Sequence, residues 1–119
     1  MSLPGQVGDA ERQRQRRTAA ALVDLLAAAI QADLPALTWS VTVTSELVGR
    51  CTAMDMPTRR REFEAWARFL APVRRWPEHA HGGVSHLRAT HTDHPPGIDV
   101  VVVADIYHQP VDGLVEVDR

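Results

Sequence analysis

The segment IDVVVVADIY, residues 98–107, constrains the fold more than any other part of the sequence. In a β-strand successive side chains point to opposite faces, so Val100 and Val102 share one face while Val101 and Val103 share the other. Both faces are therefore apolar, and a strand of this kind is normally covered on both. The chain's own core covers one face, and something else must cover the second.

The residues just before this strand predict its hairpin partner. VSHLRATHTD, residues 84–93, carries strand-forming residues, and HPPG, residues 94–97, is a turn cluster between the two strands. If Asp93 faces Ile98, then His86 faces Asp105 across the hairpin. The face that carries Val101 and Val103 then also carries His86, Arg88, Thr90, Thr92, Asp99, Asp105 and Tyr107.

A second hairpin is predicted nearer the N-terminus. LTWSVTVT, residues 37–44, alternates Leu, Trp and Val with Thr and Ser, which is the period of a strand with one apolar face. A returning strand, LVGRCTA at residues 47–53, follows a short turn. Gly49 inside it indicates a bulge or a close approach of another group to the backbone.

Two helices are predicted, one before each hairpin. The first runs from Asp9, a candidate N-cap, to about Ala32. Its buried face is predicted to consist of Leu22, Leu25, Leu26, Ala29 and Ile30. The second is MDMPTRRREFEAWARFLA, residues 54–71, with Asp55 or Thr58 as the N-cap. Its buried stripe is predicted to consist of Phe63, Trp66, Ala67 and Leu70.

The order helix, hairpin, helix, hairpin predicts an α+β fold. Short connections favour a two-layer sandwich in which a four-stranded antiparallel sheet carries both helices on one face. A chain of 119 residues has the length of one such domain. We expect a disordered leader at residues 1–8, the domain at residues 9–109 and a loosely held tail at residues 110–119.

Five of the six histidines lie between His79 and His94, which raises the question of a metal site. Such a site needs several donors converging on one ion, whereas alternation along a strand sends neighbouring side chains to opposite faces. The spacing matches no metal-binding motif, so we expect no physiological metal and no cofactor. Adventitious metal binding is expected only through His79, His81 and His94.

One histidine has a predicted carboxylate partner. His86 faces Asp105 in the register above, and Tyr107 lies further along the same strand. A His–carboxylate pair beside a tyrosine is a candidate acid–base site, and these three residues are the candidate catalytic group. The pattern is also typical of a cross-strand ion pair, which is the favoured interpretation. The single cysteine, Cys51, is interpreted as a small buried hydrophobic residue.

The arginines make nucleic acid an alternative partner. Residues 50–75 carry seven Arg and three acidic residues, giving +4, whereas the whole chain has a net charge of −2. Arg side chains at the start of a helix can contact phosphates. We find no aromatic residues suitably interleaved with these arginines for binding a single strand. The candidate nucleic-acid contacts are Arg59, Arg60, Arg61, Arg74 and Arg75.

The second apolar face of residues 98–107 favours self-association. Either the tail at residues 110–119 or a second copy of the chain could cover that face, and a two-fold homodimer is the favoured arrangement. The residues predicted to contact the partner are Val101, Val103, Tyr107 and Arg88.

The composition argues against membrane and secreted proteins. No apolar run approaches the roughly 20 residues of a membrane-spanning helix, and the N-terminus lacks the apolar segment of a secretory signal. A single cysteine excludes an internal disulfide and fits a reducing compartment. We therefore expect a cytoplasmic protein with no membrane partner.

Three stretches resemble small proteins of GC-rich actinobacteria and of their plasmids and phages. They are LPALTWSVT at residues 34–42, FEAWARFL at residues 63–70, and GVSHLRATHTDHPPGIDVVVVADIY at residues 83–107. In that group a Trp-bearing strand, a helix with an F-x-x-W core pair and an HLRA hairpin recur. The likeness spans roughly residues 20–108 and implies an αββ-type fold, but it implies no activity and assigns no functional residue.

These features favour a non-catalytic binding or regulatory module that acts as a homodimer through its sheet, with an unidentified protein as a further candidate partner. A nucleic-acid-associated accessory protein that uses the arginines is the first alternative. A small metalloprotein or enzyme centred on His86 and Asp105 is the second.

Overall fold

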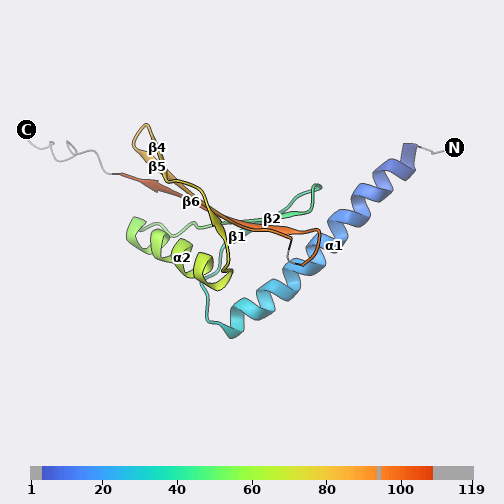
Figure 1. Ribbon diagram of the computed structural model, residues 1–119, viewed down its shortest axis with the longest axis horizontal. Coiled ribbons are helices and arrows are strands. Elements are labelled where there is room, and N and C mark those ends of the chain that lie inside the picture. The colour runs from blue at the N-terminus through green and yellow to red at the C-terminus, as the bar shows by residue number, and fades with distance from the viewer. Residues whose placement is uncertain (1–3, 94, 109–119) are drawn as a thin grey trace, which may run out of the picture.

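The computed structural model describes residues 4–93 and 95–108, in which helices and strands alternate in an α+β arrangement (Figure 1). In chain order the elements are α1 (Pro4–Gln31), β1 (Thr38–Val41), β2 (Glu46–Arg50), α2 (Met56–Phe69), β3 (Arg74–Arg75), β4 (His79–His81), β5 (Val84–His91) and β6 (Asp99–Tyr107). The α+β class expected from the sequence is therefore confirmed. The segments at residues 1–3 and 109–119, and His94, lie outside the described residues.

The strands form one mixed sheet, so the predicted four-stranded antiparallel sheet is wrong in strand number and in direction. The strand order is β1-β2-β6-β5-β3, and β4 also pairs with β5. β2 and β6 run parallel, with Leu47 opposite Val100, whereas the other pairs are antiparallel. Parallel neighbours need a long crossover connection, and the chain between β2 and β6, which contains α2, supplies it.

The hairpin formed by β5 and β6 has the predicted register. Val84 lies opposite Tyr107, His91 lies opposite Val100, and His86 faces Asp105. Next to the turn, Asp93 has a φ angle of 58°. The alternation of both strands is thus assigned as expected, with Val100 and Val102 on the side of the core.

Both helices lie on the same face of the sheet, as predicted, and form a V beneath it in the view of Figure 1. The core between the layers is built around Trp66 of α2, which is only 1% exposed. Its ring lies 5.3 Å from that of Trp39 and 5.7 Å from that of Phe69, both edge to face. Its Nε1 donates a hydrogen bond to the carbonyl oxygen of Pro35 at 2.9 Å. The buried core residues are Ala29, Leu47, Cys51, Phe63, Trp66, Ala67, Leu70, Leu87, Ala89, Ile98, Val100, Val102, Ala104 and Ile106.

Helix α1 differs from its prediction at its start and in its buried face. It begins at Pro4, so residues 4–8 are helical where a disordered leader was expected, and Asp9 is not its N-cap. Ala29 packs in the core as predicted, but Leu26 is 37% exposed and Ile30 is 75% exposed. The helix is apolar around more of its circumference than the sheet covers, so periodicity alone did not locate the covered side.

Helix α2 begins where the sequence predicts. Asp55 is the N-cap, its carboxylate accepting hydrogen bonds from the backbone N–H of Thr58 at 2.9 Å and from the Thr58 hydroxyl at 2.6 Å. These bonds lower the pKa of Asp55 from its ordinary value. Phe63, Trp66 and Ala67 are buried on one side of the helix, as predicted.

Gly49 marks a close approach, the second of the two predicted alternatives. It lies opposite Trp39 in the β1–β2 pair. A Cβ atom at residue 49 would come within 2.7 Å of the Trp39 ring. The glycine therefore fixes the position of Trp39 over the core.

The stretch between α2 and β5 contains two short strands, β3 and β4, that the sequence did not predict. β3 places Arg74 opposite Thr90, and β4 places His79 opposite His86. Strands of two and three residues are too short for a period-two pattern to show. Among the described residues, no helix is sufficiently long and apolar to span a membrane.

Candidate binding surfaces

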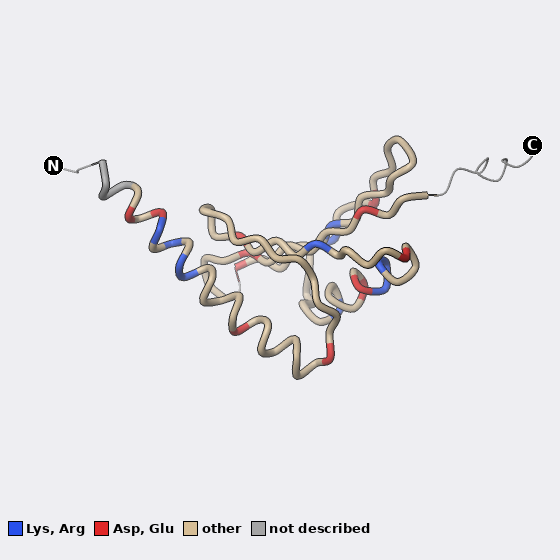
Figure 2. The backbone as a smooth tube through the Cα atoms, turned by 180° about the vertical axis from the view of Figure 1, so that it is seen from behind, with Lys and Arg blue, Asp and Glu red and all other residues tan. Residues whose placement is uncertain are grey.

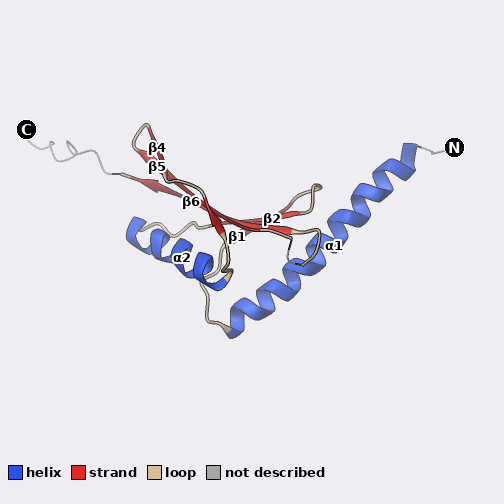
Figure 3. Cartoon of the chain, viewed as in Figure 1, coloured by secondary structure: helices blue, strands red, loops and turns tan. Residues whose placement is uncertain are grey.

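In the described part of the chain no helix covers the sheet face that is turned away from α1 and α2 (Figure 3). We call this the open face. Strand alternation and register assign to it Thr38, Ser40, Glu46, Val48, Arg50, Arg74, His79, His81, Val84, His86, Arg88, Thr90, Asp99, Val101, Val103, Asp105 and Tyr107.

The valines at the centre of the open face are better covered than the sequence led us to expect. Val101 is 0% exposed, and Val103 is half-buried. Val101 lies between Val48 of β2 and Thr90 of β5. Because no helix lies over this face, neighbouring side chains supply the second cover for Val101, and little apolar area is left bare at the centre.

An exposed indole lies at the β3 edge of the open face. Trp76 follows β3, donates its backbone N–H to the carbonyl oxygen of Arg88 at 3.0 Å, and is 41% exposed. The guanidinium of Arg74 lies 4.1 Å from the centre of the indole and that of Arg88 lies 5.7 Å from it. Trp76 was not predicted as a site residue, because its neighbours in the sequence carry no strand pattern. The run RRW was the available signal, since an aromatic residue beside arginines is typical of a stacking platform.

The predicted pair of His86 and Asp105 is present on the same face. His86 Nδ1 lies 2.7 Å from one carboxylate oxygen of Asp105, and Arg50 Nη1 lies 3.3 Å from the other. The side chains of His86 and Asp105 are 48% and 30% exposed, so water surrounds the pair. Tyr107 is 54% exposed, and its ring lies under the guanidinium of Arg59 at 5.8 Å. The arrangement matches a solvated cross-strand ion pair.

Most of the arginines proposed for nucleic acid are held by their own chain and do not form one patch. Arg59 donates to the carbonyl oxygens of Ala53 and Asp105, both at 2.8 Å. Arg61 donates to the Thr58 hydroxyl, and Arg60 pairs with Glu78 at 3.2 Å, which lowers the pKa of Glu78.

Arg75 points to the helix side of the sheet, where it forms an ion pair with Glu64. This bond lowers the pKa of the Glu64 carboxyl. Of the five predicted arginines, only Arg74 is therefore on the open face, where it is joined by Arg88 and Arg50. Neither Arg74 nor Arg88 has an ion pair with any described carboxylate.

The histidines do not form a metal centre among residues 4–93 and 95–108. No group of three or more His, Cys, Asp or Glu side chains is placed there to hold an ion. The ring of His79 stacks at 6.4 Å from that of His81 and at 6.2 Å from that of His86, so these three rings form a row on the open face. His94 lies outside the described residues.

A serine–histidine pair that was not predicted from the sequence lies where β5 begins and β6 ends. Ser85 Oγ is 2.6 Å from His108 Nε2, and the backbone N–H of His108 donates to the carbonyl oxygen of Gly83. Serine nucleophiles use such a pair. However, Ser85 is only 3% exposed and points to the core side of the sheet, so the pair closes the end of the hairpin.

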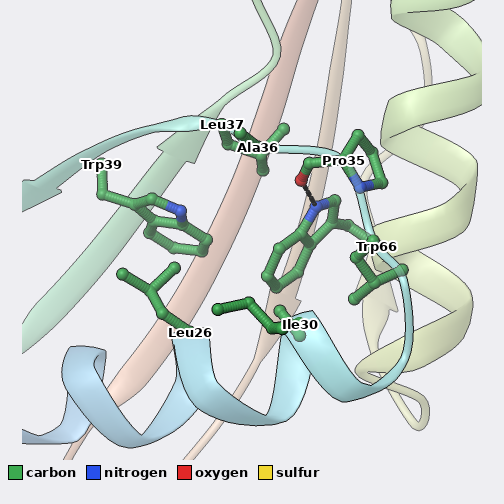
Figure 4. Close-up of a pocket in the computed structure, with 9 residues that line it drawn as sticks. Leu26, Ile30, Pro35, Ala36, Leu37, Trp39 and Trp66 are labelled. Carbon is green, nitrogen blue, oxygen red and sulfur yellow. Dashed lines mark hydrogen bonds between the residues drawn. The ribbon is translucent and has the colours of Figure 1, made fainter.

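An apolar groove lies between the C-terminal end of α1 and the segment that leads into β1 (Figure 4). Its volume is about 290 Å³, and Leu26 and Ile30 of α1 face the indoles of Trp39 and Trp66 across it. The Nε1 of Trp39 is buried and has no hydrogen-bond partner among the described residues. The groove is lined by Leu26, Ala29, Ile30, Leu34, Pro35, Ala36, Leu37, Trp39 and Trp66.

Cys51 is 1% exposed, as predicted, and burial raises the pKa of its thiol from 9.0 to about 12, with nearby Glu62 acting in the same direction. The unfolded chain loses this proton at a lower pH than the folded chain. The free energy of unfolding should therefore fall by about 1.4 kcal/mol for each pH unit between about pH 9 and pH 12. Denaturant titrations at neutral pH and near pH 11 would measure this loss.

The Cys51→Ala variant is the matched control for this pH dependence. Other groups titrate equally in both proteins, so the variant should be less sensitive to alkaline pH by about 2–3 kcal/mol near pH 11. Equal alkaline losses in the two proteins would show that the thiol is not shielded. Thiol reagents should modify the native protein at neutral pH only as fast as it unfolds.

Comparison with protein-family models, with curated proteins and with solved structures finds no match for this chain.

Proposed function

We propose that this protein is a non-catalytic binding module and that the open face of its sheet binds single-stranded nucleic acid. The observation that carries the proposal is the surrounding of Trp76, an exposed indole with the guanidinium groups of Arg74 and Arg88 beside it.

The chemistry of this cluster suits a strand of unpaired bases. Bases stack on aromatic rings and on the planar guanidinium of arginine, and the same arginines can donate to phosphate oxygens. Sheet-based RNA-binding modules use this combination of aromatic and basic side chains on a sheet surface. Trp76 and Arg74 are adjacent at the sheet edge, where an extended strand has free access.

The distribution of charge on the open face also supports an anionic ligand. The carboxylate of Asp105 is engaged within the chain, by the guanidinium of Arg50 and by the ring of His86, and the other two acidic residues of the face, Glu46 and Asp99, lie opposite each other on β2 and β6. Arg74 and Arg88 have no such carboxylate among the described residues. The β3–β5 side of the face is thus locally basic although the whole chain carries a net charge of −2.

A second copy of the chain is the other occupant that the sequence favours for this face, through Val101, Val103, Tyr107 and Arg88. Tyr107 and Arg88 are exposed and available for such a contact. Val101, however, is fully covered within one chain. Stable self-association needs a large apolar area, so we favour the nucleic acid and treat the second copy as an alternative outcome of the test.

The test is fluorescence anisotropy with labelled single-stranded RNA and DNA oligonucleotides of mixed sequence. Binding should weaken with salt, with a slope of log K against log salt of about −0.7 for each phosphate contact. Trp76→Ala should weaken binding roughly 10- to 100-fold, because one stacked base is lost. Arg74→Ala with Arg88→Ala should weaken binding and make the salt slope shallower.

Arg61→Ala is the matched control, because Arg61 is exposed and lies away from the open face. It should bind as the wild type does. Absence of binding at low salt, or binding that Trp76→Ala leaves unchanged, would refute the proposal. Concentration-dependent dimers that Val103→Arg abolishes would instead assign the open face to a second copy.

A further inference from the structure

We infer that α1 pairs antiparallel with α1 of a second copy of the chain, through an apolar seam of the half-buried Ala19 and the exposed Val23, Leu26 and Ile30. This inference is separate from the proposed nucleic-acid site, because α1 lies on the other side of the sheet from the open face (Figure 1).

The apolar surface of α1 is wider than its own sheet can cover. Residues 18–32 contain a single charge, that of Asp24. Within this stretch Val23 is 66% exposed, Leu26 is 37% exposed and Ile30 is 75% exposed. A helix on the surface of a domain normally has one apolar stripe, which faces the core. The second stripe on α1 therefore requires a cover from outside the described part of this chain.

The spacing of the seam fits a partner helix. Ala19, Val23, Leu26 and Ile30 are separated by four, three and four residues, which are the a and d positions of a heptad repeat. Val23 and Ile30 occupy the a positions, and Leu26 occupies a d position. An apolar stripe restricted to a and d positions is the narrow seam of a coiled coil, so the expected occupant is a single helix.

The charges at the two ends of the seam favour an antiparallel second copy. Arg16 occupies the preceding a position of the helix, and Asp33 lies in the turn that follows the last helical residue, Gln31; both are exposed. Antiparallel packing that sets Val23 against Leu26 of the second copy also brings Arg16 to the C-terminal end of the second α1, close to the turn that carries Asp33. A parallel pair would place Arg16 against Arg16.

The rest of α1 has the same polarity. Its arginines all lie on the N-terminal half, which extends beyond the sheet (Figure 2); with Asp9 and Glu11 they give residues 4–17 a net charge of +2, whereas residues 18–31 carry only the negative charge of Asp24. Arg17 extends the basic end, and neither Arg16 nor Asp33 has an ion pair with a described residue. The C-terminal end of a helix also carries partial negative charge. Each end of α1 is therefore complementary to the opposite end of a second α1.

The groove beside α1 extends the same apolar surface. Leu26 and Ile30 belong both to the seam and to the lining of the groove, next to Trp39 (Figure 4). In the antiparallel pair the small Ala19 of the second copy faces Ile30, which allows the helices to approach closely there. The partner helix would thus close the open side of the groove.

The first test is the mass of the full chain in solution, by light scattering and sedimentation. We expect a reversible dimer. Val23→Asp with Ile30→Asp should weaken association roughly 100-fold or more, because two charges would enter the centre of the interface. Both residues are exposed in one chain, so the circular dichroism spectrum of the monomeric variant should match that of the wild type. Val43→Asp is the matched control, since Val43 is 46% exposed but lies off the seam.

The second test determines the orientation of the helices. Ala19→Cys and Ile30→Cys proteins are mixed and oxidised, while the buried Cys51 does not react. Antiparallel pairing predicts a disulfide between the two variants in preference to disulfides within either one. Arg16→Glu should weaken the dimer roughly tenfold, and adding Asp33→Arg should restore it.

Three results would overturn the inference. The first is a chain that stays monomeric up to millimolar concentration. The second is a dimer that survives Val23→Asp with Ile30→Asp. The third is a preference for disulfides between identical variants, which would establish parallel pairing.

Discussion

Trp66→Ala is expected to lower the free energy of unfolding by about 3–5 kcal/mol, close to the whole stability of many small domains. Trp66 is 1% exposed and joins three parts of the fold through Trp39, Phe69 and the carbonyl of Pro35. Truncation removes both ring contacts and leaves the Pro35 carbonyl without its donor. A shift of the urea midpoint with an unchanged slope would measure the loss.

Trp76→Ala is the control matched in chemistry but not in burial. Trp76 is 41% exposed and packs mainly against two guanidinium groups, so its truncation should cost less than about 1 kcal/mol. The two variants should therefore differ in effect: Trp66→Ala should lower stability, and Trp76→Ala should weaken nucleic-acid binding. Similar losses of stability from the two variants would contradict this description of the core.

The β5–β6 hairpin could be predicted in detail from the sequence because two constraints agree there. The turn cluster fixes which residues lie opposite one another, and a slip of one residue would send the alternating side chains to the wrong faces. The pair formed by His86 and Asp105 follows from the same register. Local chemistry is sufficient in such a case, because both strands are neighbours in the chain.

The parallel pairing of β2 with β6 could not be predicted in this way. The alternation of apolar and polar side chains in a strand is the same whichever neighbour the strand pairs with. The sequence pattern therefore does not indicate which strands of different hairpins lie side by side. The choice depends on where α2 returns the chain, which is a property of the whole fold. The predicted number of strands was wrong for a simpler reason. β3 has only two residues, which is too short for an alternating pattern to show.

The candidate sites show the same division between local and global information. Because β6 is apolar on both faces, the sequence predicted that its second face would be left uncovered. In the structure Val101 is covered by its neighbours, and the exposed aliphatic side chains lie instead along α1. The alanine-rich sequence of α1 contained the signal, because residues 18–32 are apolar around most of the helix. Choosing the covered side requires knowing where the sheet lies.

Val101→Asp is expected to destabilise the chain by more than about 4 kcal/mol even though no described helix covers the face on which it lies. The variant loses the buried apolar side chain and places a carboxylate where the exposed fraction is zero. Of its two cross-strand neighbours, Val48 offers no polar group, and the hydroxyl of Thr90 is buried and has no hydrogen-bond partner among the described residues. One hydroxyl donor cannot replace the water shell of a carboxylate, so the penalty remains.

Val103→Asp is the control on the same strand and the same face. Val103 is half-buried, so an introduced carboxylate can reach water there and the cost should be nearer 1 kcal/mol. The pH dependence separates the two variants further. Burial raises the pKa of the carboxylate introduced by Val101→Asp above its unfolded value, so its penalty should shrink as the pH falls toward about 4. Equal costs for the two variants at neutral pH would show that water reaches Val101, and would return the centre of the open face to consideration as an interface.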